Sequence, residues 1–461
     1  MKRILTLILI ATIGSSLAQR SFETTPQTIN LAPASQNPLA NRSVDVFTAE
    51  DFMKQAAAGG SIYLAEGVYE LNAPLVLTNN VKIVGAGMDK TIISSSVAGN
   101  VIQFASDGQF ELKGVSVIHA GNEYGNALQL DGGKVVIRQS RFSGGVWNAE
   151  MNVGGVGLLV LGTTQGKLNY NVFENNGLHG ASIGVTSKMD VDENTFTNNM
   201  ASGLVYWGNA SGRASNNVIN NNNEHGILVA DQANPRLDTN TIRANGGHGI
   251  ALWGDSSGRI IKNAIESNGQ DGIFLAAGNH PKIDFNVIKS NTQNGISYWG
   301  SATGSAISNQ IENNGINGIS IGGTANPYIF KNDIRYNTAA GVALWEEATG
   351  DLIENSIEAN GTDGIVIEAK VNTRIENNFI SKNFQNGISI WNNAYARVIG
   401  NHIIANQLSG YSAAEYSHSN IQKNEIRANE RWGVISAATA KVNLVENIVV
   451  DNIDGNVYLE E

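Results

Sequence analysis

Apolar and polar positions repeat at a constant interval over most of this chain. Between residues 157 and 456 an asparagine returns at every twenty-third position, and the residue two places later is Phe, Ile or Val. This row comprises Asn171, Asn194, Asn217, Asn240, Asn263, Asn286, Asn309, Asn332, Asn355, Asn378, Asn401, Asn424 and Asn447. A second asparagine follows at the fifth position after each, from Asn176 to Asn452, and a glycine recurs from Gly157 onward.

A unit of this length with short alternating runs has room for strands and tight corners, and it lacks any pattern of helical length. Asn and Gly tolerate the left-handed backbone that tight corners demand. Stacked coils would place identical residues above one another, so that asparagine side chains form hydrogen-bonded ladders and Ile side chains fill a continuous core. A leucine-rich horseshoe has a similar period, but it requires Leu at fixed spacing and a helical back. The pattern therefore predicts an all-β fold, a parallel β-helix with regular coils over 157–456.

The stretch before the repeats predicts one helix. In FTAEDFMKQAAAGG, Thr48 with Asp51 forms a capping-box pattern, Phe47 with Phe52 forms a staple, and Gly59 is a stop. We expect a short cap helix within 48–60, at the start of a β-helix domain that covers 48–461. Residues 1–18 have the basic start, apolar centre and small residues before the cleavage point that are typical of a signal peptide, and the Pro-, Ser- and Asn-rich residues 19–47 predict a linker or N-terminal arm.

These patterns resemble the right-handed parallel β-helix repeats of the pectate-lyase-like superfamily, including its carbohydrate-binding and sugar-hydrolase type repeats. The opening FTAEDFMKQAAAGGSIYLAEGVYELNAPLVLTNNVKIVGAGMDKTII is similar to the cap helix and first coils of such proteins. The resemblance covers nearly the whole mature chain and implies a right-handed, single-stranded solenoid. It implies much less about activity, because one fold hosts many functions.

A tryptophan recurs at every forty-sixth position, which makes two coils the true repeat unit. The strand alternation in GISYWG puts the tryptophan outside, because the Ile position faces the core. The predicted outer row consists of Trp207, Trp253, Trp299, Trp345 and Trp391, and mostly small residues stand between its members.

Two coils rise about 9.6 Å, close to the length of a disaccharide in an extended chain. Indoles are flat platforms for sugar rings. The row is thus a candidate polysaccharide-binding surface, and the alternative is that each indole only covers the outer wall.

Basic residues form a second row with the same interval as the asparagines, consisting of Arg213, Arg236, Arg259 and Lys282, and Arg374 and Arg397 resume it later in the chain. A row of like charges suits an anionic ligand such as a uronate polymer. The alternative is local neutralisation by Asp238 and Asp284, two positions further along the same face.

Candidates for catalysis are sparse. Glu368 lies between Trp345 and Trp391 in the predicted stack, with Glu346, Glu347 and Lys370 beside it. Gly247-His248-Gly249 matches one motif of polygalacturonase-like enzymes, but the partner motifs of that group are missing, and His179 and His225 occupy the same repeat slot. The Asp-Pro-His signature of alginate epimerases is missing as well. The insertion VWNAEMN, with Trp147 and Glu150, breaks the period within 100–156 and is a candidate functional loop.

The formal charge is −11, which argues against nonspecific nucleic-acid binding, and the lack of cysteine leaves no disulfide framework. Apart from the signal, no segment suits membrane insertion. We expect a secreted protein (periplasmic, cell-surface or extracellular) that binds polysaccharide without a metal. One rival is a polysaccharide lyase or epimerase for an acidic polysaccharide, and a lyase would imply Ca²⁺. The other is a structural or adhesive rod without ligand.

Overall fold

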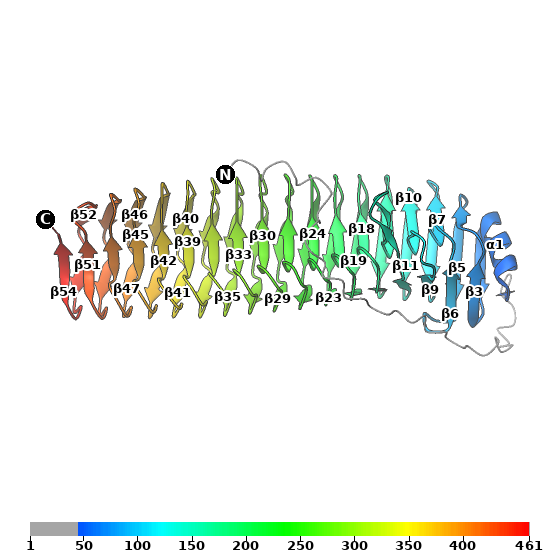
Figure 1. Cartoon of the computed structure of the whole chain (residues 1–461), viewed down its shortest axis with the longest axis horizontal. Coiled ribbons are helices and arrows are strands. Elements are labelled where there is room, and N and C mark those ends of the chain that lie inside the picture. The colour runs from blue at the N-terminus through cyan, green and yellow to red at the C-terminus, as the bar shows by residue number, and fades with distance from the viewer. Residues whose placement is uncertain (1–44, 461) are drawn as a thin grey trace. The chain divides into compact units, whose positions relative to one another are not determined.

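The computed structural model describes residues 45–460, and everything below concerns them. The predicted signal at 1–18 and most of the predicted arm at 19–47 lie outside these residues. The described chain winds into a right-handed stack of coils along one axis, with helix α1 (Ala49–Ala58) at the first coil and β54 (Gly455–Leu459) at the last (Figure 1). The predicted fold class, including the single helix, is confirmed.

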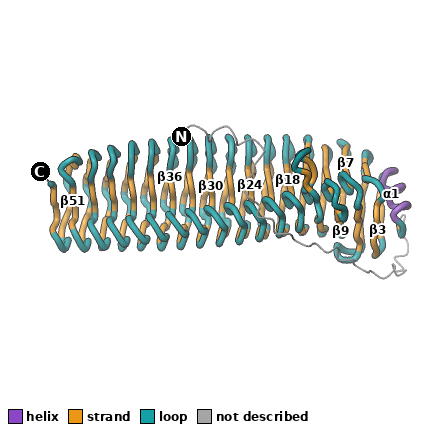
Figure 2. Tube along the Cα trace, viewed as in Figure 1, coloured by secondary structure: helices purple, strands orange, loops and turns teal. Residues whose placement is uncertain are grey.

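Each regular coil contributes one short strand to each of three parallel sheets, and the corners between the strands lie above one another (Figure 2). We name the sheets in the order in which a coil visits them. Sheet 1 consists of β4 (Leu75–Leu77), β7 (Ile102–Ala105), β10 (Leu128–Asp131), β15 (Leu158–Leu161), β18 (Ala181–Ile183), β21 (Leu204–Tyr206), β24 (Ile227–Val229), β27 (Ile250–Leu252), β30 (Ile273–Leu275), β33 (Ile296–Tyr298), β36 (Ile319–Ile321), β39 (Val342–Leu344), β42 (Ile365–Ile367), β45 (Ile388–Ile390), β48 (Tyr411–Ala413), β51 (Trp432–Ser436) and β54. Sheet 2 consists of β1 (Asp45–Val46), β2 (Gly60–Leu64), β5 (Val81–Gly85), β8 (Gln109–Lys113), β11 (Lys134–Arg138), β16 (Gln165–Asn169), β19 (Lys188–Asp192), β22 (Ser211–Ser215), β25 (Asn234–Asp238), β28 (Arg259–Ile261), β31 (Lys282–Asp284), β34 (Ser305–Ile307), β37 (Tyr328–Phe330), β40 (Thr349–Ile353), β43 (Asn372–Glu376), β46 (Tyr395–Ile399), β49 (His418–Gln422) and β52 (Lys441–Val445). Sheet 3 consists of β3 (Gly67–Leu71), β6 (Thr91–Ser95), β9 (Ser116–His119), β12 (Arg141–Ser143), β17 (Val172–Glu174), β20 (Thr195–Thr197), β23 (Val218–Asn220), β26 (Thr241–Arg243), β29 (Ala264–Glu266), β32 (Val287–Lys289), β35 (Gln310–Glu312), β38 (Asp333–Arg335), β41 (Ser356–Glu358), β44 (Phe379–Ser381), β47 (His402–Ile404), β50 (Glu425–Arg427) and β53 (Ile448–Val450).

Both asparagine rows form the predicted ladders, one between sheets 2 and 3 and one between sheets 3 and 1. The Asn263 side-chain amide donates to the Asn286 Oδ1 at 3.0 Å, and Asn286 donates in the same way to Asn309 at 2.9 Å. Each Oδ1 also accepts from the backbone N–H of the preceding ladder residue, as Asn286 does from Asn263 at 2.9 Å. The left-handed residue at this corner precedes the ladder asparagine rather than being it, as Lys262 does with φ 56°. The ladder thus satisfies buried backbone groups at every corner.

The core consists of inward side chains stacked in register. Phe142, Phe173 and Phe196 stack on successive sheet 3 strands with ring centroids 5.2 and 4.8 Å apart, and Ile219 continues the column. These side chains are fully buried. The strict spacing of apolar residues in the sequence is therefore the spacing of one continuous core.

Helix α1 begins as the capping box predicts. Thr48 accepts a hydrogen bond from the Asp51 backbone N–H at 3.2 Å, and Gly59 caps the other end with φ 84°. Phe52 and Ala56 bury the helix face against the first coils. No helix among residues 45–460 combines the length and apolarity needed to span a membrane.

Candidate functional site

The five repeating tryptophans lie where the chain turns from sheet 1 into sheet 2, and we call this row the tryptophan corner. Its members are Trp207, Trp253, Trp299, Trp345 and Trp391. All five are partly exposed, and Trp299 is the most open, with 46% of its surface accessible. The backbone N–H of each bonds to the preceding coil, so the positions repeat without slip.

The intervening coils make room for the indoles. A side chain on Gly322 would place its Cβ 2.5 Å from the Trp299 Cζ3 and 2.7 Å from the Trp345 Nε1. Gly184 is covered in the same way by Trp207, whose Nε1 donates to the Ser182 Oγ at 3.0 Å. Two indoles and the glycine between them thus form one nearly continuous aromatic strip. The same packing also covers the wall, as the alternative interpretation required.

The outer face of sheet 1 lies beside this corner. Its outward residues are small or polar on many coils, including Ser182, Ala251, Ser297, Ser320 and Ala343. These side chains have at most 7% of their surface exposed. Small residues therefore lie beside part of the corner, and the partly exposed Leu228, Phe274 and Val366 interrupt the row on other coils.

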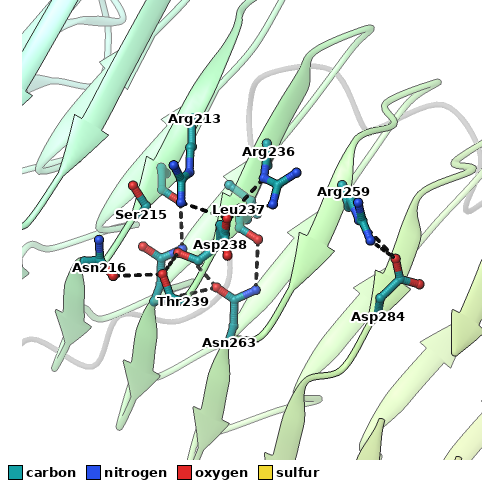
Figure 3. Close-up of polar contacts among 12 residues, drawn as sticks. Arg213, Ser215, Asn216, Arg236, Leu237, Asp238, Thr239, Arg259, Asn263 and Asp284 are labelled. Atoms are coloured by element: carbon teal, nitrogen blue, oxygen red, sulfur yellow. Dashed lines mark hydrogen bonds and ion pairs between the residues drawn. The ribbon is translucent and has the colours of Figure 1, made fainter. Parts of the chain in front are cut away.

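The arginine row lies on the outer face of sheet 2, in register on β22, β25, β28 and β31. Arg213 and Arg236 both reach Asp238, each at 2.9 Å from its Oδ2, and Arg259 reaches the Asp284 Oδ2 at 3.0 Å (Figure 3). The carboxylate side chains are 6% and 9% exposed, so the pairs are partly shielded from water. The alternative of local neutralisation is thus realised for these three arginines.

The remaining basic candidates differ from one another. Arg374 pairs with Glu376 and lies 4.0 Å from Asp351. Lys282 and Arg397 are exposed on the same face, and among residues 45–460 neither forms an ion pair. The structure therefore does not bring the six basic residues together as one anion-binding surface.

The acidic candidates are adjacent in space but have separate local roles. Glu346 occupies the corner residue with φ 62°, and its Oε2 accepts from the Gly323 backbone N–H at 2.8 Å. Glu347 pairs with Lys370 at 3.3 Å on an exposed surface. Glu368 stands in register between Trp345 and Trp391. Within the described part of the chain, no group of three or more His, Asp and Glu side chains is placed to hold a metal.

The three histidines of one repeat slot form part of a polar column beside sheet 1. His225 and His248 stack with ring centroids 5.2 Å apart, and Phe274 continues the stack at 4.6 Å. The Nδ1 atoms of His179, His225 and His248 accept backbone N–H bonds from the next coil at 3.1 to 3.2 Å. Burial lowers the pKa of His179 and of His225 to about 4, and burial together with the charge of His225 lowers that of His248 to about 3. The imidazoles are therefore neutral at physiological pH, with the ring proton on Nε2.

Asp271 continues this column, and sequence patterns did not single it out. Burial raises the pKa of its carboxyl, and hydrogen bonds from Asn294 oppose the rise. Its Oδ2 lies 3.4 Å from the His248 Nδ1, but that nitrogen already accepts the Asp271 backbone N–H, so the two do not form an ion pair while His248 is neutral. The residue at this position of the repeat changes from His to Asp to Asn along the chain. The column therefore does not show in the sequence as one repeated residue type.

The predicted functional loop forms a small antiparallel hairpin, β13 (Trp147–Asn148) with β14 (Val153–Gly154). Trp147 is partly buried, whereas Glu150 is exposed. A Cβ on Gly155 would lie 2.6 Å from the Trp147 Cβ, and the Trp147 Nε1 is buried without a hydrogen-bond partner among the described residues. The hairpin precedes β15, two coils before β21 and Trp207.

Comparisons with solved structures return several parallel β-helix enzymes at low similarity. The "Agl-KA catalytic domain" is 14% identical, with a TM-score of 0.45; the alignment covers 70% of this chain and 66%, just under two thirds, of that domain. The "periplasmic alginate epimerase AlgG" is 12% identical over 88% of this chain and 84% of its own, with a TM-score of 0.35. The A-module of the Azotobacter vinelandii mannuronan C-5 epimerase AlgE4 is 15% identical over 89% and 91%, with a TM-score of 0.33. Likeness at this level carries no argument about activity.

The family of this chain follows from comparison of its sequence with family models. Comparison with curated protein sequences gives no match. The model described as "Right handed beta helix region" matches residues 77–214, 205–333 and 317–460. These matches together span more than half of the chain. The chain therefore belongs to the right-handed β-helix family.

Proposed function

We propose that this protein is exported and binds a polysaccharide chain along the tryptophan corner. The observation that carries the proposal is the constant position of five partly exposed indoles, two coils apart, with glycine or alanine at most of the coils between them. The repeat of about 9.6 Å suits an extended sugar chain whose alternate rings stack on the indoles.

Two features support binding over simple wall covering. Trp299 keeps 46% of its surface accessible in spite of its contact with Gly322. Beside Trp299 and Trp345 the outward residues of sheet 1 are the small Ser297, Ser320 and Ala343, so a chain of sugar rings could lie close to the sheet there. An aromatic row beside small side chains leaves room for the apolar faces of sugars to stack on the indoles.

The test is intrinsic fluorescence, because five of the seven tryptophans belong to the corner. The mature protein is titrated with neutral and acidic polysaccharides. We expect a saturable shift that is lost in the double variant W253A/W299A and retained in W147F, which alters a tryptophan of the hairpin. A folded protein that shows no shift with any polymer, or a double variant that still shows the full shift, contradicts the proposal.

The second candidate is a rod in which the indoles only protect the wall. The observation in its favour is the hydrogen bond from the Trp207 Nε1 to Ser182, which anchors that indole to the preceding coil. The same titration separates the two functions, since a rod responds to no polymer. A saturable shift would prompt a search for cleaved or epimerised product, which addresses the enzymatic rival.

A further inference from the structure

A groove of about 710 Å³ lies on the outer face of sheet 2, over the coils that precede the tryptophan corner. It crosses six neighbouring strands of the sheet, β2, β5, β8, β11, β16 and β19. The outward side chains that line it include Lys82, Glu111, Lys134, Val136, Lys167 and Lys188. None of these residues was singled out by the sequence pattern.

Part of the positive charge is neutralised at one end of the groove. Glu111 accepts from Lys82 at 3.0 Å and from Arg138 at 2.5 Å, so one carboxylate serves two cations. Burial alone would raise the pKa of this carboxyl, but the hydrogen bonds from Lys82 and Arg138 outweigh it, and the pKa is lowered. This cluster therefore retains one excess positive charge.

The other three lysines are unpaired among residues 45–460. Lys134, Lys167 and Lys188 are exposed, and they form no ion pair there. Lys134 and Lys188 are two strands apart in the same register row, and Lys167 lies on the strand between them. Two strands correspond to about 9.6 Å, so the three ammonium groups face one short stretch of surface. Asp190, the one further acidic residue in the lining, is in register with Lys167 on the next strand, so the three lysines together with Asp190 carry a net charge of +2.

The groove differs from the arginine row further along the same sheet. There Asp238 and Asp284, both almost buried, hold the guanidinium groups of Arg213, Arg236 and Arg259. In the groove no buried carboxylate lies beneath the three lysines, because Val136 occupies the centre with 38% of its surface exposed. An excess of positive charge in a protein of net charge −11 marks a local anion-binding surface.

We propose that this groove binds an anionic polysaccharide through Lys134, Lys167 and Lys188. Carboxylate or sulfate groups on the sugar chain would pair with the ammonium groups, and the exposed valine would contact the apolar face of a ring. The lining includes no exposed aromatic side chain on which a nucleic-acid base could stack, which disfavours a single-stranded nucleic acid. The site lies on a different sheet from the tryptophan corner and does not depend on it.

The test measures binding of a decameric oligogalacturonate and of a sulfated dextran fragment by calorimetry at low salt. The groove variant is K134Q/K167Q/K188Q. Its matched control is K289Q/K331Q/K423Q, which removes the same charge from lysines that pair with Glu266, Glu354 and Glu446 elsewhere. We expect the wild type to bind at least one of the two saccharides, with a Kd raised about tenfold or more in the groove variant and unchanged in the control.

Further measurements test whether the binding belongs to this groove. W253A/W299A should bind these anionic saccharides as the wild type does, so the failure of one site is distinguishable from the failure of the other. Raised salt should weaken the binding, because the contacts are exposed charges. The proposal is overturned if neither saccharide binds, if the two lysine variants lose affinity equally, or if a single-stranded DNA of equal charge binds the groove more tightly than either saccharide. Circular dichroism of all variants verifies that the fold is retained.

Discussion

The indole Nε1 of Trp207 donates a hydrogen bond to the hydroxyl of Ser182, 3.0 Å away on the preceding coil. Ser182 lies on the outer face of sheet 1 with 6% of its surface exposed. This bond fixes the first indole of the corner across the coil boundary and lays it over Gly184. The position and orientation of the Trp207 indole are therefore set by the preceding coil, which has no tryptophan at this position.

Removal of this hydroxyl should release the indole. We expect S182A to lower the free energy of unfolding by about 1 kcal/mol, because the buried side of the indole loses its acceptor. The emission of Trp207 should also shift to longer wavelength. S320A is the matched control, since Ser320 occupies the same row at 5% exposure. Urea denaturation followed by circular dichroism measures the difference, and equal values for the two variants would contradict the assignment.

The asparagine ladder predicts a difference between interior and terminal positions. In N286A, the Asn263 backbone N–H and the Ile260 carbonyl each lose a buried partner, as does the Asn309 side chain. We expect a loss of about 2–4 kcal/mol, from unsatisfied groups at 1–3 kcal/mol each with partial relaxation. N447A should cost less, because Asn447 ends its row and is only partly buried. Denaturant midpoints of the two variants provide the comparison.

Asp238 predicts a salt-dependent effect. Its removal in D238A leaves Arg213 and Arg236 side by side on neighbouring strands without their shared carboxylate. We expect destabilisation of about 1–3 kcal/mol at low salt, and less at 1 M salt because repulsion between the arginines is screened. D351A should change stability little, since Asp351 makes only a 4.0 Å, half-exposed contact with Arg374. A salt series that leaves the difference between these variants constant would argue against the shared-carboxylate role.

The histidine column predicts acid sensitivity. The pKa values of His179, His225 and His248 fall to about 4, 4 and 3, from 6.5 in the unfolded chain. Below pH 6.5 the unfolded state binds protons that the folded state does not, so stability falls as the pH drops from about 7 toward 4 and levels off below the folded values. The triple variant H179N/H225N/H248N should flatten this slope by at least about 1 kcal/mol per histidine between pH 7 and 4.

Asparagine is the appropriate replacement, because Asn294 and Asn317 occupy the same slot and accept the same backbone bond. H280N, at an exposed histidine outside the column, is the control and should leave the pH profile unchanged. An unchanged slope in the triple variant would show that other groups govern acid unfolding.

The sequence predicts the coils well because every repeated residue has one structural role. An asparagine at the repeat position of Asn286 forms the ladder in each regular coil. A Phe or Ile at the repeat position of Phe196 and Ile219 fills the core. The site is predicted less well because surface roles depend on neighbours in adjacent coils. The pairing of Arg213 with Asp238 appears in the sequence as a step of one coil and two positions, but the column of His248 and Asp271 changes residue type from coil to coil.

The lysine groove was missed for a different reason. Lys134 pairs in register with Gln165, and Gln165 pairs with Lys188 on the next strand. The hairpin insertion at 147–154 lengthens the first of these two steps, so a search at constant period cannot align the lysines. Only the pairing of the strands brings them together.

The close fit of Gly322 between Trp299 and Trp345 restricts how the length of this molecule can vary during evolution. Deletion of two coils, such as residues 263–308, would join two equivalent positions of the repeat. At the junction an indole would still face a small residue on the adjacent coil. Deletion of a single coil would place two indoles on adjacent coils, where one would occupy the space that a glycine now leaves. Natural variants of this protein should therefore differ in length by pairs of coils, and the reach of its outer surface should change in steps of about 9.6 Å.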